Sequence, residues 1–154
     1  FRGTGHVVRF IEYMDVGTCN AWDTTRVVPS SELRARIAAR WPIDAVGANY
    51  PGAVAERYRY RDGEGEIGFI RSVSQPFCGD CSRARLSADG RLYTCLFGKH
   101  GHDLRSVMRN GVDDAGLHEL IAAIWRSRDD RYSELRGSVP AVERERVEMY
   151  EIGG

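Results

Sequence analysis

The arrangement of three cysteines restricts what this chain can fold into more than any other feature of the sequence. Cys78-Gly79-Asp80-Cys81 is followed by Cys95, which makes a Cys-x2-Cys-x13-Cys array. Residues 84–87 and 91–95 are predicted to form a β-hairpin that turns at Ala88-Asp89-Gly90, with Cys95 on the second strand. A hairpin returns Cys95 toward the first two cysteines, so three thiolates can converge. The array therefore predicts a metal centre.

The spacing leaves two kinds of metal centre open. By spacing alone a structural zinc ribbon is the leading interpretation, and an iron–sulfur cluster is the alternative. A closed zinc site needs four ligands, and only His100, His102 or the distant Cys19 could complete the three thiolates. Three thiolates on a four-iron cluster would instead leave one iron open to a substrate.

Two arginines directly after the second cysteine favour a phosphate-bearing ligand. Arg83 and Arg85 flank the small Ala84. If this segment is extended, both guanidinium groups point to the same face, where two donor forks suit a polyphosphate. The alternative is a solvated strand edge.

The remaining pattern predicts an α+β fold. Residues 7–14 are almost continuously apolar, as in a strand buried on both faces of a parallel sheet, and its neighbours are expected upstream. The other predicted elements are a helix capped by Ser30 or Ser31 and closed by Pro42, a hairpin of residues 55–61 and 66–73, a short helix from Leu104 to near Gly111, and a helix over residues 114–126 whose apolar stripe packs in the core. Residues 126–146 are charged and predicted to be surface or poorly ordered.

Composition excludes several classes of protein. The 154 residues, 42% of them hydrophobic, suffice for one core. The net charge of zero removes the electrostatic argument for nucleic acid or an anionic membrane as partner. The sequence has no apolar run of roughly 18 residues and no signal peptide, so we expect a soluble, cytoplasmic protein cut from something longer.

Three motifs together resemble a known family. They are the run Arg9-Phe10-Ile11-Glu12-Tyr13-Met14-Asp15-Val16-Gly17, the run from Phe77 to Ser87 with Cys95-Leu96-Phe97-Gly98, and the terminal Ile152-Gly153-Gly154. In this order they resemble the GTP 3′,8-cyclases, radical S-adenosylmethionine enzymes that begin molybdenum cofactor synthesis. The resemblance runs from Val7 to Gly154, essentially the whole chain.

The resemblance implies a division into two parts. Residues 1–28 would be the end of an incomplete TIM-type (β/α)6 barrel, namely its last strand and the following loop. Residues 29–154 would be the C-terminal GTP-binding domain, an antiparallel sheet with helices that carries an auxiliary iron–sulfur cluster.

It also implies a role for each motif residue. Cys78, Cys81 and Cys95 would ligate a 4Fe-4S cluster whose open iron binds guanine. The nucleotide would also contact Arg83, Ala84 and Arg85, with the two arginines gripping the triphosphate. Met14 would lie at the S-adenosylmethionine site, Arg9 would face the cavity, and Gly153 and Gly154 would reach into the active site. Cys19 has no place in the family motif, although a fourth-ligand role stays open.

One departure from the family pattern limits what this chain can do. It contains no Cys-x3-Cys-x2-Cys motif, so S-adenosylmethionine and a second 4Fe-4S cluster would belong to the N-terminal half of the full-length enzyme. That enzyme would convert GTP to (8S)-3′,8-cyclo-7,8-dihydroguanosine 5′-triphosphate by a 5′-deoxyadenosyl radical mechanism, and this chain alone should be inactive.

The expected partners are GTP, the missing half and a downstream cyclic pyranopterin monophosphate synthase, with a homodimer left open. The alternatives from other classes are a structural zinc-binding interaction module and a sulfur-carrier module that uses the terminal glycines.

Overall fold

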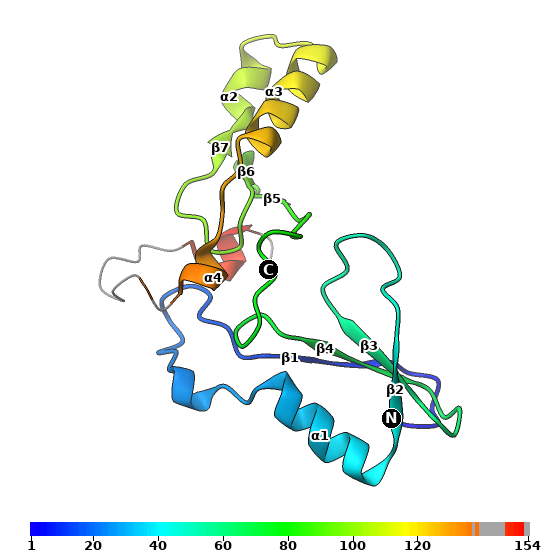
Figure 1. The fold of residues 1–154 in the computed structure, drawn as a ribbon. Helices are drawn as coiled ribbons and strands as arrows, with labels where there is room; N and C mark the ends of the chain where they lie inside the picture. The colour runs from blue at the N-terminus through cyan, green and yellow to red at the C-terminus, as the bar shows by residue number, and fades with distance from the viewer. Residues whose placement is uncertain (137, 139–146, 153–154) are drawn as a thin grey trace. The chain divides into compact units, whose positions relative to one another are not determined.

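A computed structural model describes residues 1–136, 138 and 147–152. The chain divides into two compact units, one made of Phe1–Met14 and Trp22–Cys81, the other of Asp15–Ala21 and Ser82–Gly154 (Figure 1). The predicted boundary after residue 28 does not separate these units. The assignment of residues 1–28 to the end of a barrel stays a prediction.

The first unit is a four-stranded mixed sheet with one helix. Its elements are β1 (Val8–Ile11), the 3-10 helix η1 (Thr24–Arg26), α1 (Ser30–Arg40), β2 (Ile43–Val46), β3 (Glu56–Tyr60) and β4 (Glu66–Ile70). The strand order is β1-β4-β3-β2, with β1 parallel to β4 and the other neighbours antiparallel. The predicted hairpin is confirmed as β3 and β4. The turn between them includes Gly63, whose φ of 82° favours glycine.

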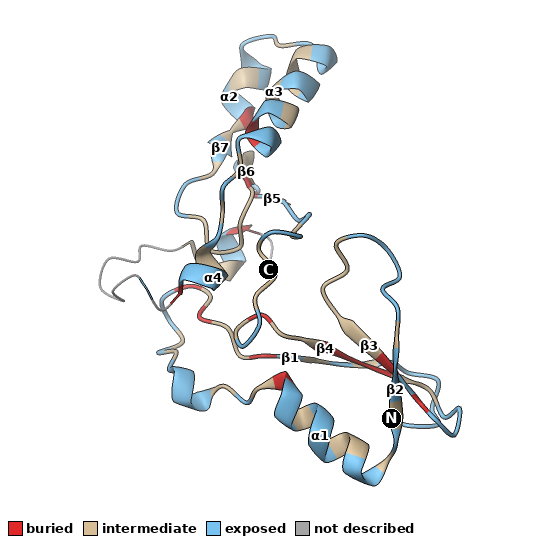
Figure 2. Ribbon diagram, in the orientation of Figure 1, coloured by how far each residue is buried: buried red, intermediate tan, exposed pale blue. Residues whose placement is uncertain are grey.

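The core of this unit lies between the sheet and α1. Tyr58, Tyr60, Ile67 and Phe69 are buried, and Leu33, Ile37 and Trp41 of the helix segment pack against them (Figure 2). The three helix residues recur four apart, so they share the face that meets the sheet. The predicted helix is therefore confirmed.

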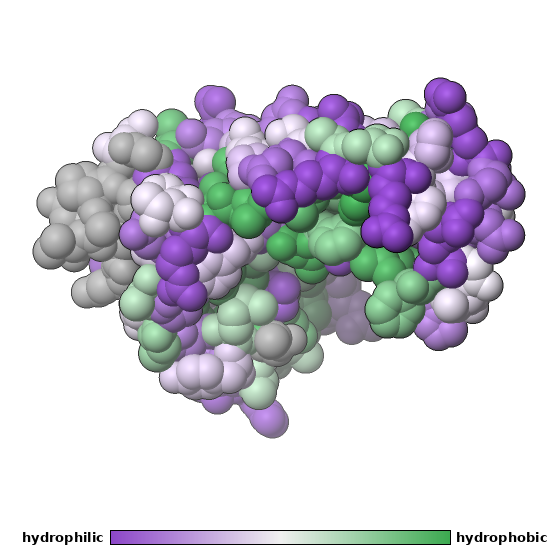
Figure 3. Space-filling model, turned by 90° about the horizontal axis from the view of Figure 1, so that it is seen from below, coloured by the Kyte–Doolittle hydropathy of each residue, from purple (hydrophilic) through white to green (hydrophobic). Residues whose placement is uncertain are grey.

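The prediction for the first strand was wrong about its burial. β1 buries only one face, because Val8 and Phe10 are partly buried while Arg9 and Ile11 are exposed, Ile11 to 57%. Its described parallel partner β4 lies downstream in the sequence, and the expected upstream neighbours stay a prediction. β1 is an edge strand among the described strands, so β4 is its one described neighbour. Figure 3 shows hydrophobic residues grouped among hydrophilic ones on the face that it displays.

The second unit carries a small antiparallel sheet and most of the helices. Its elements are β5 (Arg85–Leu86), β6 (Arg91–Tyr93), β7 (His102–Asp103), α2 (Leu104–Arg109), α3 (Asp114–Arg126), α4 (Tyr132–Leu135) and the 3-10 helix η3 (Met149–Ile152). The strand order is β5-β6-β7. β5 and β6 confirm the second predicted hairpin, and α2 and α3 confirm the two predicted helices.

Two predictions for this unit need correction. The apolar stripe of α3 is only partly core, because Ile124 is buried whereas Ile121 and Trp125 are exposed. Residues 126–146 are not uniformly surface, because α4 forms within them and Arg136 is buried. The segment has few apolar residues, so its sequence does not predict burial. Arg136 is buried because it pairs with Asp15, a carboxylate far away in the sequence. The rest of the segment, residues 137 and 139–146, lies outside the described residues.

The coarse fold prediction is confirmed, because the chain is α+β with a mixed and an antiparallel sheet. Among the described residues, no helix combines the length and the apolar character that a membrane span requires.

Candidate metal and nucleotide site

The first two cysteines lie on one tight turn in the first unit. The Cys81 amide donates to the Cys78 carbonyl oxygen at 3.3 Å, and both side chains are partly buried. The turn includes Gly79, around which a Cβ atom would meet nothing within 4 Å. Paired cysteines on a tight turn are how thiolate sites are commonly built, so the local geometry fits a metal ligand pair.

Cys95 lies on a second tight turn, two residues past the end of β6. The prediction placed it on the strand, which ends at Tyr93. The Gly98 amide donates to the Cys95 carbonyl at 3.1 Å, and the Phe97 amide donates to Cys95 Sγ at 3.5 Å. Hydrogen bonds to the sulfur stabilise a thiolate and tune the metal that it holds. The Cys95 turn therefore also fits a ligand.

Convergence of the three thiols stays a prediction, because Cys78 and Cys81 belong to the first unit and Cys95 to the second. Within the described ranges, the side chains of His, Cys, Asp and Glu form no group of three that could hold a metal ion. His100 and His102, the candidate fourth zinc ligands, are exposed.

The nucleotide-binding candidates occupy the segment that leads into β5. Arg83 and Ala84 precede the strand and are exposed, whereas Arg85 is its first residue and is partly buried. Since only Arg85 lies in the strand, a shared face for the two guanidinium groups stays a prediction.

A buried carboxylate that the sequence analysis did not single out fixes the segment before Cys78. Glu12, which follows β1, accepts hydrogen bonds from the amides of Ser30, Val73 and Ser74 at 2.7 to 2.9 Å and from Ser74 Oγ at 2.6 Å. It therefore joins the end of β1, the start of α1 and the turn after β4. The expected cap by the Ser30 or Ser31 side chain is wrong: the N-cap residue is Pro29, and the Glu12 carboxylate serves the Ser30 amide instead.

This arrangement predicts an acid-sensitive contribution to stability. Burial raises the pKa of Glu12, but the hydrogen bonds from Ser74, Ser30 and Val73 outweigh it, so the pKa lies below its ordinary 4.5. Because the folded state binds the proton less readily than the unfolded state, the stabilisation is complete above pH 4.5 and is lost as the pH falls through the folded pKa. We expect Glu12→Gln to lower the free energy of unfolding at pH 7 by about 2 to 3 kcal/mol.

The measurement is urea unfolding of the full-length protein followed by tryptophan fluorescence, between pH 7 and pH 3.5. The difference between the wild type and Glu12→Gln should shrink below pH 4.5. A difference that stays constant over this range would contradict the assignment.

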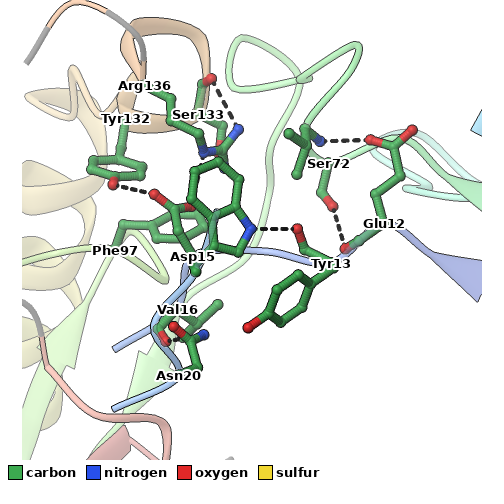
Figure 4. Close-up of polar contacts among 12 residues, drawn as sticks. Glu12, Tyr13, Asp15, Val16, Asn20, Ser72, Phe97, Tyr132, Ser133 and Arg136 are labelled. Atoms are coloured by element: carbon green, nitrogen blue, oxygen red, sulfur yellow. Dashed lines mark hydrogen bonds and ion pairs between the residues drawn. The ribbon is translucent and has the colours of Figure 1, made fainter. Parts of the chain in front are cut away.

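A second buried carboxylate lies in the second unit, behind the Cys95 turn. Asp15 Oδ1 accepts from Arg136 Nε at 2.8 Å, and Asp15 Oδ2 accepts from the Tyr132 hydroxyl at 2.6 Å. Figure 4 shows Tyr132 and Arg136 converging on Asp15, with Phe97 beside them. The Asp15 and Arg136 side chains are only 1% and 8% exposed, so each charge depends on the other.

This ion pair also contacts Phe97, whose amide donates a hydrogen bond to Cys95. The Phe97 ring stacks on Tyr132 with centroids 4.4 Å apart, and the Arg136 guanidinium lies 5.5 Å from the Phe97 centroid. Phe97 in turn donates its amide to Cys95 Sγ. The Asp15–Arg136 pair thus supports the backbone that positions the third cysteine.

The structure places the remaining predicted residues as follows. Arg9 is exposed on β1 and Met14 is partly buried at the end of the first segment of the first unit. Gly153 and Gly154 lie outside the described residues. The roles of all four stay predictions.

The comparisons with known proteins identify the class of this chain. Residues 6–134 match the family model described as Molybdenum Cofactor Synthesis C. The chain belongs to this family, which confirms the resemblance seen in its motifs.

Individual relatives agree with that assignment. The chain is 57% identical over all 154 residues to a GTP 3′,8-cyclase of Xanthomonas axonopodis pv. citri, covering 45% of that protein. It is 58% identical over 139 residues to the GTP 3′,8-cyclase of Acidothermus cellulolyticus, covering 88% of this chain and 38% of that protein. A third GTP 3′,8-cyclase, from Synechococcus sp. (strain CC9902), is 43% identical over 153 residues, which is 99% of this chain and 44% of that protein. The chain therefore spans less than half the length of these relatives.

Proposed function

We propose that this chain is the substrate-binding half of a GTP 3′,8-cyclase of molybdenum cofactor synthesis. The observation that carries the proposal is the Cys-x2-Cys-x13-Cys array with Arg83 and Arg85 between its second and third cysteines, in a chain that matches GTP 3′,8-cyclases along its whole length. In the full-length, cytoplasmic enzyme, the other half would supply S-adenosylmethionine and its cluster. This chain alone would turn over nothing.

The cysteines would hold the auxiliary 4Fe-4S cluster. Cys78 and Cys81 would contribute one turn, and Cys95 a second turn already supplied with an amide donor to its sulfur. When bound, such a cluster supplies an iron with an open coordination position that a purine can occupy.

The chain's own side chains would orient the nucleotide. Arg83 and Arg85 would bind the triphosphate through charge-assisted hydrogen bonds, and the small Ala84 would let the nucleotide approach the backbone. Fixing both ends of GTP holds the ribose still between them, and such orientation can supply several of the roughly 7 to 11 kcal/mol available from this source. Arg9, Gly153 and Gly154 would act at the reacting centre, and Met14 at S-adenosylmethionine.

Substitution of the arginines tests the nucleotide site. We expect Arg83→Ala or Arg85→Ala in the reconstituted full-length enzyme to weaken the binding of GTP by about 1.5 to 3 kcal/mol. The binding of guanosine should weaken far less, because only GTP carries the phosphates. Anaerobic equilibrium binding of both ligands measures the difference. Arg36→Ala is the control, because Arg36 is an exposed α1 residue paired with Glu32. Equal losses for GTP and guanosine would place the arginines away from the phosphates.

The competing function is a structural zinc-binding interaction module. The feature that favours it is the Cys-x2-Cys turn itself, which suits zinc as well as iron. It predicts about one zinc per chain, no colour and no affinity for GTP.

A further inference from the structure

Within the second unit, the residue before the last described helix, η3, binds the loop that follows Asp15. Glu148 Oε1 accepts from the Thr18 amide at 2.6 Å, from the Thr18 hydroxyl at 2.5 Å and from the Cys19 thiol at 3.6 Å. Three donors, two from Thr18 and one from Cys19, thus meet one oxygen atom. We call this arrangement, Glu148 on residues 17–19, the tail anchor.

The loop is shaped to admit the carboxylate. Gly17 has a φ of 67°, a conformation that side chains rarely adopt. A Cβ atom at Gly17 would also collide with the Glu148 carboxylate. The backbone conformation therefore favours glycine at position 17, and a larger residue there would also displace the Glu148 carboxylate.

The anchor fixes the beginning of η3, and a buried side chain fixes its end. The Glu151 amide donates to the Glu148 carbonyl at 3.0 Å, and Glu151 Oε2 accepts from the Glu148 amide at 3.0 Å. Ile152, the last residue of η3, is only 2% exposed. Gly153 follows it directly in the sequence, so both ends of the segment that leads into the terminal glycines are held.

The contribution of Glu148 to global stability is small, so its hydrogen bonds are better explained by a role in fixing a position. Glu148 is partly buried, but its hydrogen bonds to Thr18 lie at an exposed position, so they compete with water and contribute little to global stability. The pKa of Glu148 lies below its ordinary value because the Thr18 hydroxyl and amide donate to it, which keeps it ionised at neutral pH. An ionised side chain with three directed donors is suited to fixing a position.

We propose that Glu148 is a positioning residue: it holds η3, which directly precedes Gly153 and Gly154 in the sequence, on residues 17–19, and so acts on the reaction through these glycines. The inference rests on the proposed function, in which these glycines act at the reacting centre. It assigns the anchoring to Glu148 with Thr18 and to the buried Ile152.

The test uses the full-length enzyme with its clusters reconstituted under anaerobic conditions. We expect Glu148→Ala to lower kcat for GTP cyclisation about tenfold or more, because misplacement of a reacting group by about 1 Å can cost a hundredfold. The Kd for GTP and the iron content should stay within about twofold, since neither the cysteines nor the arginines are touched. Glu119→Ala, which removes an exposed carboxylate of α3, is the matched control and should leave kcat unchanged.

Two further measurements separate positioning from general damage. Hydrogen exchange of the Met149–Ile152 amides should become at least about tenfold faster in Glu148→Ala but not in Glu119→Ala. In a double-mutant cycle, Glu148→Ala should add nothing to the loss caused by deleting Gly153 and Gly154, because both act through the same tail.

The outcomes distinguish the two proposals. Unchanged exchange at Met149–Ile152 overturns the anchor, and additive losses in the cycle overturn its action through the glycines. A wild-type enzyme that forms no cyclised product overturns the proposed function, whereas the exchange result still decides whether Glu148 holds η3.

Discussion

Asp15→Asn is expected to reduce the local opening free energy around the Cys95 turn by about 3 to 5 kcal/mol, because it leaves a buried guanidinium without its counter-charge. Asp15 is the acceptor for both Arg136 and Tyr132, and its side chain is 1% exposed. Water cannot replace the lost charge at such a site. Native-state hydrogen exchange of residues 93–98 and 132–136 in the full-length protein measures the change without assuming a single unfolding transition.

The chain supplies a matched control for this substitution. Arg61 contacts both oxygens of Asp44, so the pairing resembles that of Asp15 with its two donors, but these side chains are 66% and 61% exposed. Asp44→Asn should therefore cost no more than about 1 kcal/mol at the β2–β3 amides. If the two substitutions cost the same, burial does not govern the Asp15 pair, and the explanation given for the Cys95 turn is wrong.

The features that the sequence predicted well are local ones. The helix Asp114–Arg126 matched its predicted range, and both hairpins formed where short glycine-containing turns separate strand-like runs. A turn residue or an apolar repeat determines the conformation of its immediate neighbours, so the local sequence is enough to predict such a helix or hairpin.

The buried polar network could not be predicted in the same way. Arg136 lies 121 positions from Asp15 in a segment that is otherwise charged, and nothing nearby distinguishes it from the exposed arginines. Glu12 and Asp15 did give a signal, because each is an acidic residue in or beside a nearly continuous apolar run, where a charge must find partners. Their partners came from loops and chain ends, which only the folded chain brings together.

The sequence clearly marked the three cysteines and two arginines of the candidate site. The structure adds the residues that support the cysteine turns, whereas the convergence of the cysteines stays a prediction. Glu12 fixes the turn that precedes Cys78. In the second unit, Arg136, which is paired with Asp15, packs on the ring of Phe97, and the Phe97 amide donates a hydrogen bond to Cys95 Sγ. Residues around a metal ligand hold it in the orientation that the metal requires. In the proposed function, each of these carboxylates would support a cysteine ligand without touching the metal.

Cys81→Ser or Cys95→Ser in the full-length enzyme is expected to remove one whole cluster, lowering iron from about eight to about four per chain. GTP affinity should fall with the iron, since the open iron would be lost, whereas the cluster of the other half should remain and keep its spectrum. Iron and sulfide analysis after anaerobic reconstitution, with equilibrium binding of GTP, measures both effects.

Cys19→Ser is the matched control for these substitutions, because the Cys19 thiol is exposed and contacts Glu148. It should keep all the iron. Loss of iron in Cys19→Ser would make Cys19 a fourth ligand, which would close the coordination position proposed for guanine. A wild-type chain that holds about one zinc and no auxiliary cluster would instead favour the structural zinc module. The iron content of these three variants therefore decides whether the array is an open substrate site or a closed structural one.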